Sequence, residues 1–314
     1  AVVVPPAPAP SPLPASAGSS GDAPTQPLPA PPPPLVPEYD LLRCIGQGAY
    51  GDVWLARNVV GLYVAVKIVR RHRFAGDGPF EREFKGVTKF MPLSRSHPGL
   101  VQLLHVGRNQ AADYFYYVME AADDEAAGQR IHPDTYQARV LGRDLQQRGR
   151  LSILECLRLS IALADALAYL HQHQLIHRYI KPNNVIFVNG QPKFADVGLV
   201  TDVQTEGHEV SFLGTEGYIA PEGPGAKVSD IYSLGRLIYM AAMGRDQRQF
   251  PDLPTALVQG ADPVPVLRLN KIILTACQVN PSARYQSAEE LRGALKELLH
   301  DLEGGGGRRE GSSM

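Results

Sequence analysis

Apolar residues lie in short continuous runs in the first part of the chain, between about residues 38 and 120. The runs 62–69 and 114–118 are rich in β-branched and aromatic side chains, a composition typical of β-strands. One predicted helix interrupts the strands, because four apolar residues recur on a single helical face: Phe80, Phe84, Val87 and Met91. The pattern therefore predicts a small, sheet-rich lobe in this part of the chain.

The spacing of apolar residues becomes helical from about residue 150 onward. Apolar side chains recur every three or four positions at Leu154, Leu157, Ile161, Ala164 and Ala168, which predicts a long buried helix. Further along, the dipeptide Asn189-Gly190 separates two strand-like runs, and this arrangement predicts a two-residue β-hairpin. We therefore expect an α+β fold, with a small β-rich lobe followed by a larger, mainly helical lobe.

Composition marks the limits of the folded region. Residues 1–36 hold 13 of the 27 prolines, which predicts an extended, disordered linker; a docking site for a proline-reading module is the alternative. Residues 303–314 are glycine-rich and predict a flexible tail. We expect the folded region to span residues 37–302, with the first lobe ending near residue 120. The polar stretch 123–139 predicts a solvated loop just beyond it.

The overall composition excludes several classes of protein. The 314 residues include 31 Lys or Arg and 32 Asp or Glu, and the net charge of −1 argues against a basic surface for nucleic acid or anionic membranes. Cys44, Cys156 and Cys277 are too few for a disulfide scaffold, which favours a reducing compartment. Because the sequence shows neither a long apolar run nor a signal peptide, we expect a cytoplasmic protein, or the cytoplasmic part of a larger membrane-anchored chain.

Three glycines, Gly46, Gly48 and Gly51, form a G-x-G-x-x-G motif. Glycines at this spacing let backbone amides approach phosphate oxygens, although an ordinary glycine-rich turn has the same pattern. Strand-like residues follow the motif, whereas a dinucleotide-binding fold has a helix there. The motif therefore favours a phosphate-binding loop between two strands over a dinucleotide site.

Lys67 lies in the middle of an apolar strand-like stretch. A lysine that points outward from a surface strand would explain this stretch alone, whereas a buried lysine needs a partner. Glu83 is the expected carboxylate partner because it lies beside the apolar stripe of the predicted helix, and Glu81 is the alternative. Asn184 in a loop and Asp196 after the hairpin carry the oxygen ligands that Mg²⁺ prefers, although each alone is more often a turn residue.

The joint order of these motifs resembles the eukaryotic-type protein kinase domain over about residues 38–300. The motifs are Gly46-x-Gly48-x-x-Gly51-x-Val53, Val64-Ala-Val-Lys67, His177-Arg178 with Asn184 after them, Asp196-x-Gly198 and Ala220-Pro-Glu222. The stretches at 97–101 and 118–120 are similar to bacterial, Hanks-type serine/threonine kinases. The resemblance implies a bilobal kinase fold that transfers the γ-phosphate of Mg-ATP to Ser or Thr hydroxyls of a protein substrate or signalling partner.

The resemblance also implies roles for single residues. Lys67 would hold the α- and β-phosphates and pair with Glu83, and Asn184 and Asp196 would hold Mg²⁺. Lys181 is similar to the lysine that follows the catalytic Asp by two positions. The implied nucleotide-binding residues are Ile45, Gly46, Gly48, Gly51, Val53, Ala65, Lys67, Met119, Glu120, Ala122 and Ile186.

The segment before Glu222 is similar to the part of the family that receives the substrate peptide. In this comparison Thr215 would line the substrate site, and Arg284 would pair with Glu222. Three hydroxyl residues in the same region are candidate phosphosites, and Arg178 is placed to pair with such a phosphate. These candidates are Thr201, Thr205 and Ser211.

Tyr179 stands where the family has the catalytic Asp. That Asp orients the substrate hydroxyl or accepts its proton, whereas a phenol, with a usual pKa of about 10, is neutral at pH 7 and mainly donates. Loss of a positioned general base costs about 10²–10⁴ in rate. We therefore expect Mg-ATP binding with strongly reduced phosphoryl transfer.

Two interpretations of Tyr179 stay open at this point. The chain is a pseudokinase that uses nucleotide occupancy to recruit partners, or it is a kinase in which Tyr179 is a sequence error or a recent change, since Asp and Tyr codons can differ by one base. A small-molecule phosphotransferase is disfavoured, because the segment 214–222 serves protein substrates in the family.

Overall fold

The computed structural model describes residues 34–49, 51–109, 111–196, 201–202, 217–260 and 262–305. The predicted disordered segment lies outside the described residues except for its last three positions, and so does the tail from residue 306 onward. Helix α7 (Ala288–Gly305) continues to Gly305, so it includes the first residues of the stretch whose composition predicts a tail. None of the described helices combines the length and apolar composition needed to cross a bilayer.

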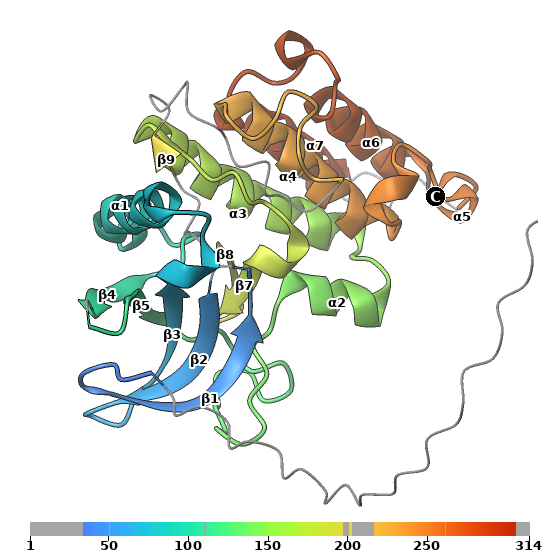
Figure 1. The fold of residues 1–314 in the computed structure, drawn as a ribbon. Helices are drawn as coiled ribbons and strands as arrows, with labels where there is room; N and C mark the ends of the chain where they lie inside the picture. The colour runs from blue at the N-terminus through green and yellow to red at the C-terminus, as the bar shows by residue number, and fades with distance from the viewer. Residues whose placement is uncertain are drawn as a thin grey trace, which may run out of the picture. The chain divides into compact units, whose positions relative to one another are not determined.

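The first lobe is one antiparallel sheet with the strand order β1-β2-β3-β5-β4 (Figure 1). Its strands are β1 (Tyr39–Gln47), β2 (Gly51–Asn58), β3 (Tyr63–Arg70), β4 (Leu103–Asn109) and β5 (Tyr114–Glu120). Both faces of β3 and β5 are covered, because Val66 and Val118 pack in one apolar cluster while Val69 and Phe115 pack in the main core. This double burial explains why their sequences are apolar throughout rather than alternating.

Helix α1 (Asp77–Ser94) packs beside this sheet, as its apolar spacing predicts. Phe80 and Val87 are buried, and the ring of Phe84 contacts Phe115 of β5 with centroids 5.3 Å apart. The short helix η1 (Arg71–Arg73) connects β3 to α1. The packing places the face of α1 that carries Glu83 against the sheet, so a polar group is carried into the core of the first lobe.

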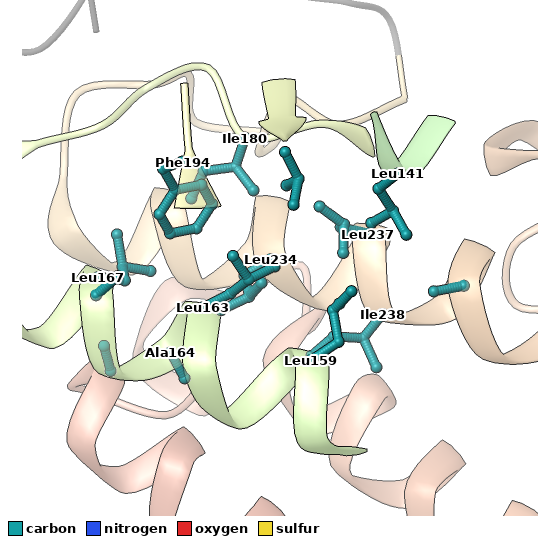
Figure 2. Packing of buried hydrophobic residues seen from close by; sticks show 14 of the residues in the cluster. Leu141, Leu159, Leu163, Ala164, Leu167, Ile180, Phe194, Leu234, Leu237 and Ile238 are labelled. Atoms are coloured by element: carbon teal, nitrogen blue, oxygen red, sulfur yellow. The ribbon is translucent and has the colours of Figure 1, made fainter. Parts of the chain in front are cut away.

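The second lobe is mainly helical, and it packs around α3 and α4. Its elements are α2 (Leu141–Arg148), α3 (Ile153–Gln172), β6 (Leu175–Ile176), η2 (Pro182–Asn184), β7 (Val185–Val188), β8 (Gln191–Phe194), β9 (Thr201–Asp202), α4 (Lys227–Met243), η4 (Gln247–Gln249), α5 (Thr255–Val258), α6 (Val264–Ala276), η5 (Pro281–Ala283) and α7. Figure 2 shows side chains of the two central helices meeting: Leu159, Leu163 and Leu167 from α3, and Leu234, Leu237 and Ile238 from α4. The predicted α+β architecture, sheet first and helices second, is confirmed.

Two local predictions have different outcomes in this lobe. Asn189 and Gly190 have positive φ angles of 52° and 73° between β7 and β8, so the predicted two-residue hairpin is confirmed. The buried stripe predicted for α3 is wrong at its start, because Leu154 is 40% exposed. Ser152 and Glu155 form a capping box that begins the helix there, and Leu154 lies in the first turn, before the helix enters the core.

The stretch predicted to be a solvated loop is a loop with an exposed middle, but Asp123, Asp124 and Tyr136 within it are buried. In this connecting loop (residues 121–140), Tyr136 is 1% exposed and its hydroxyl donates to the Ala122 carbonyl at 3.0 Å. The Asp124 carboxylate accepts backbone N–H groups from Ala126, Ala127 and Gln137 at 2.8–2.9 Å. Asp124 therefore satisfies backbone groups of the loop itself, while polar residues such as Arg130 and Asp134 face water.

Candidate active site

The glycine-rich loop (residues 46–51) turns between β1 and β2. The Gly48 amide donates to the Gly51 carbonyl at 2.9 Å and closes the turn. A Cβ on Gly51 would lie 2.3 Å from the Ile68 carbonyl oxygen, so no larger residue fits where β2 begins beside β3. Val53 pairs in register with Lys67 on the neighbouring strand, which places the loop next to the lysine that the sequence singles out.

Lys67 lies between two carboxylates from different elements. Its Nζ is 2.5 Å from Asp196 Oδ1 and 4.0 Å from Glu83 Oε1, and the residue is 8% exposed. Glu81, the alternative partner, instead binds Arg108 at 2.8 Å and Arg71 at 3.3 Å. The structure therefore brings Glu83, and not Glu81, to the buried lysine.

The charges of this cluster are set by burial and by the carboxylates. Burial acts to lower the pKa of Lys67, but the negative charges around it, Asp196 first, outweigh burial and raise this pKa well above its ordinary value. Burial likewise acts to raise the pKa of Asp196, and the ammonium of Lys67 lowers it overall. The pair is therefore fully ionised near neutral pH.

Glu83 behaves differently because it is 4% exposed and neither of its oxygens has a hydrogen-bond partner among the described residues. Burial raises the pKa of Glu83 to about 7, and the charge of Lys67 opposes this rise only in part. The glutamate that backs the lysine is therefore close to half-protonated at neutral pH.

Replacing Glu83 with Gln is expected to remove a pH dependence of stability between about pH 4.5 and 7. A carboxyl whose pKa is raised on folding stabilises the fold fully below its ordinary value of 4.5, and this contribution is lost as the pH rises through about 7. The wild type should therefore lose about 1 kcal/mol per pH unit relative to E83Q across this window, measured by urea unfolding at several pH values.

The control is Glu81→Gln, because the hydrogen bond from Arg108 lowers the pKa of Glu81 and keeps this carboxyl ionised over the window. Parallel pH curves for the wild type and E83Q would contradict the prediction.

Tyr117 lies beside Lys67, although the sequence alone assigns it no role at the site. It pairs in register with Lys67 on β5, is completely buried, and its hydroxyl has no hydrogen-bond partner among the described residues. The Lys67 ammonium lies 5.7 Å from its ring centroid, and burial raises the pKa of its phenol. Tyr117 is one of three tyrosines in β5, so the sequence does not single it out, and its register opposite Lys67 requires the structure.

Asp230 of α4 anchors the loop 177–184, and this aspartate is 1% exposed. The Asp230 carboxylate accepts the backbone N–H groups of His177 and Arg178, each at 2.8 Å, and contacts His171 Nε2 at 3.0 Å. Arg178 has a φ of +66°, a strained value for a residue with a Cβ, and the two bonds to Asp230 stabilise it. The loop conformation is thus fixed by the buried carboxylate of Asp230 rather than by the backbone preferences of the loop residues.

Tyr179 is half-buried, and its hydroxyl contacts Lys181. The Lys181 ammonium donates to Tyr179 Oη at 3.1 Å and lies 4.3 Å from the ring centroid. The Asn184 side-chain amide donates to the Tyr179 carbonyl at 2.8 Å, and Lys181 also contributes to lowering the pKa of Asp196. Lys181 therefore lies between the phenol of Tyr179, which it contacts, and the carboxylate of Asp196, whose charge it stabilises.

Asn184 and Asp196 suit a divalent cation by the chemistry of their donors. The Ala195 amide donates to the Asn184 carbonyl at 2.8 Å, so the two residues are tied together by the backbone, and both carry hard oxygen donors. Within the described ranges, no group of three His, Cys, Asp or Glu side chains could hold a metal by itself. A Mg²⁺ ion here would therefore complete its ligands with water or phosphate oxygens.

Three of the predicted nucleotide-binding residues, Met119, Glu120 and Ala122, lie where β5 ends and the connecting loop begins. Met119 pairs in register with Ala65 of β3, and both are buried. Glu120 is fixed because its carboxylate accepts from Lys193 Nζ at 2.6 Å and from the Gln102 amide at 2.7 Å. Ala122 is buried, and three further members of the predicted set are partly buried: Ile45, Val53 and Ile186.

The region predicted to bind the peptide is described only in part. Thr205, Ser211 and Thr215 lie outside the described residues, and Thr201 pairs through its backbone with Ile176. The region ends at Glu222, whose carboxylate is held by three hydrogen bonds. Arg284 donates to both carboxylate oxygens at 2.6 and 2.7 Å, and Ser229 donates to one of them at 2.9 Å.

Comparison with known proteins places this geometry in context. The model of the protein kinase domain family matches residues 39–301. Serine/threonine-protein kinase PrkC of Bacillus subtilis is 30% identical over 277 residues, covering 82% of this chain and 40% of the relative. PknB of Mycolicibacterium smegmatis is 29% identical over 83% of this chain and 43% of its own length, and PknA of Mycobacterium tuberculosis is 30% identical over 79% and 58%. The chain thus spans about two-fifths of the length of the first two relatives.

Proposed function

Because the chain belongs to the protein kinase domain family, we propose that it binds Mg-ATP at the Lys67–Asp196 pair and transfers the γ-phosphate to Ser or Thr hydroxyls only weakly. The main support for a nucleotide site is the ion pair between Lys67 and Asp196, whose Nζ and Oδ1 are 2.5 Å apart. Glu83 lies 4.0 Å from the same ammonium. A buried ammonium beside a carboxylate can bind phosphate on one side and a divalent cation on the other. The serine/threonine assignment is supported by the names of the relatives.

Each group of this chain has a defined part in the proposal. The glycine-rich loop offers backbone N–H groups to phosphate oxygens, and the charged Lys67 neutralises phosphate charge. Mg²⁺, when bound through Asn184 and Asp196, would offset the charge that develops during transfer. Tyr179 places a phenol where the family has the carboxylate that orients the incoming hydroxyl and accepts its proton, and this loss weakens the transfer.

A second function is favoured by the contact between Tyr179 and Lys181. Because Lys181 already donates to the phenol at 3.1 Å, its ammonium is engaged beside the catalytic position. A nucleotide that binds without efficient transfer would instead stabilise one lobe arrangement, and the chain would then act as a nucleotide-dependent interaction module.

A thermal-shift titration with Mg-ATP tests the nucleotide site. At 100 times its Kd a ligand stabilises the fold by about 2.7 kcal/mol, which should raise the Tm by about 5–10 °C for a folded region of this size. Lys67→Ala is expected to abolish most of this rise, and chelation of Mg²⁺ should reduce it. Lys271→Ala, which changes an exposed lysine of α6, is the matched control and should keep the full shift. An unchanged Tm for the wild type would refute the proposal.

A further inference from the structure

Arg73 of η1 donates hydrogen bonds to the glycine-rich loop between β1 and β2 and to the residue that follows it. Its Nη1 donates to the Gly48 carbonyl at 2.9 Å, and its Nη2 donates to Asp52 Oδ2 at 3.0 Å. Gly48 lies within the turn, and Asp52 is the first residue after it, so one rigid guanidinium bridges the turn and its exit. Together with the bond between the Gly48 amide and the Gly51 carbonyl, this contact fixes the path of the loop.

Asp52 makes this contact difficult to release. Its carboxylate is buried at the start of β2, and Arg70 Nε lies 3.9 Å from the same oxygen that Arg73 binds. The other oxygen, Oδ1, is buried and has no hydrogen-bond partner among the described residues. Because a buried carboxylate depends strongly on its remaining charged partners, Arg73 is held where it contacts the loop.

The position of Arg73 is itself fixed through η1. Arg71, at the other end of this short helix, binds Asp113 at 2.6 Å and the start of α1 through Asp77 at 2.8 Å. The loop is thus attached to η1, and η1 is in turn bound to α1 and to the turn before β5. Glycines give the loop little conformational restraint of its own, so an external attachment has a large effect on its order.

We infer that Arg73 is a positioning residue that orders the glycine-rich loop in advance of nucleotide binding, so that the loop need not be ordered when the phosphates bind. The part of this inference that concerns phosphates rests on the proposed function. The loop adjoins the phosphate site, because Val53, two residues after Gly51, pairs in register with Lys67. Ordering a binding loop beforehand removes an entropic cost of binding.

Nucleotide titrations followed by the fluorescence of Trp54, the chain's single tryptophan on β2, test the inference. For Arg73→Ala we expect Mg-ATP and Mg-ADP to bind about three- to tenfold more weakly, the size expected for loss of one ordinary, solvent-accessible hydrogen bond. Adenosine, which has no phosphates, should bind within twofold of the wild type. Arg73→Lys, which keeps the charge but not the planar fork, should give an intermediate loss.

Asp52→Asn separates positioning from simple charge attraction. If Arg73 acted only by attracting phosphate at a distance, removing the negative charge of Asp52 would strengthen Mg-ATP binding. If Arg73 orders the loop, D52N releases it and weakens binding as R73A does. Arg57→Ala is the matched control, because Arg57 lies on the same sheet in an exposed pair with Asp40 and contacts neither end of the loop.

Hydrogen exchange of the nucleotide-free protein gives a readout that needs no ligand. The Gly48 amide, protected by the Gly51 carbonyl in the wild type, should exchange at least about tenfold faster in R73A and D52N, while the amides of α3 keep their protection. If exchange in residues 46–53 stays within twofold of the wild type, Arg73 does not order the loop. Should the wild type bind no nucleotide, the proposed function fails separately and the exchange result alone decides the role of Arg73.

Discussion

Replacing Tyr179 with Asp is expected to raise the rate of protein phosphorylation by about 10²–10⁴-fold, the usual contribution of a positioned general base. The phenol oxygen now accepts a hydrogen bond from Lys181 at 3.1 Å and offers a proton rather than a second acceptor. An ionised carboxylate could accept from both Lys181 and an incoming hydroxyl. Transfer of labelled phosphate from Mg-ATP to the chain itself and to a generic protein substrate measures the effect.

The substitution should be tolerated because the backbone contacts of Tyr179 do not need its side chain. Its amide contacts His177 Nδ1 at 3.3 Å, and its carbonyl accepts from Asn184. Asp230 holds the two preceding amides independently. The loop therefore keeps its shape when the ring is removed, and a change in rate reports chemistry rather than local unfolding.

Tyr179→Phe is the control, because it keeps the ring and removes the hydroxyl. We expect Y179F to transfer phosphate as slowly as the wild type, and all three proteins to show the same thermal shift with Mg-ATP. A wild type that works at the usual kinase turnover of about 1–100 s⁻¹ would contradict the impairment. If Y179D binds nucleotide but stays inactive, the interaction module becomes the better description.

Two predictions that rest on residues close together in the sequence are confirmed by the structure. The hairpin at Asn189-Gly190 and the helix that carries Phe80 follow from turn chemistry and from a period of 3.6 residues, and both are local properties. The preference for Glu83 over Glu81 has the same local basis, because Glu83 lies beside the apolar stripe of α1. The binding of Glu81 to Arg108 could not be predicted in this way, because it depends on the packing of α1 against the sheet.

The connecting loop shows why other features could not be predicted. Its polar composition suggested exposure, yet Asp123 is buried and accepts the amides of Asn189 and Gly190 at 2.9 and 2.8 Å, across 66 residues or more of sequence. Arg43 of β1 donates to the carbonyls of Pro133 and Tyr136 in the same way. A pattern based on hydrophobicity counts these residues as solvated, because it does not register backbone groups that come from distant parts of the chain.

Replacing Arg284 with Ala is expected to lower the free energy of unfolding by about 3–5 kcal/mol, because three backbone carbonyls and the partly exposed Glu222 carboxylate lose their donor. The Arg284 side chain is completely buried and donates to both oxygens of Glu222. It also donates to three backbone carbonyls, those of Gln278, Val228 and Val279. Since 1 kcal/mol corresponds to about 2–4 °C in a domain of this size, the Tm should fall by about 10 °C.

The loss should come mainly from the groups that Arg284 leaves behind, and two variants test that origin. Arg268→Ala breaks an exposed pair with Asp301 on the same lobe and should cost less than about 1 kcal/mol. The double variant with Glu222→Gln removes the stranded charge, so it should cost less than the sum of its single changes. If urea unfolding gave R284A and R268A similar stabilities, the pair would not anchor the segment that ends at Glu222, and that segment would depend on Ser229 and the α4 contacts instead.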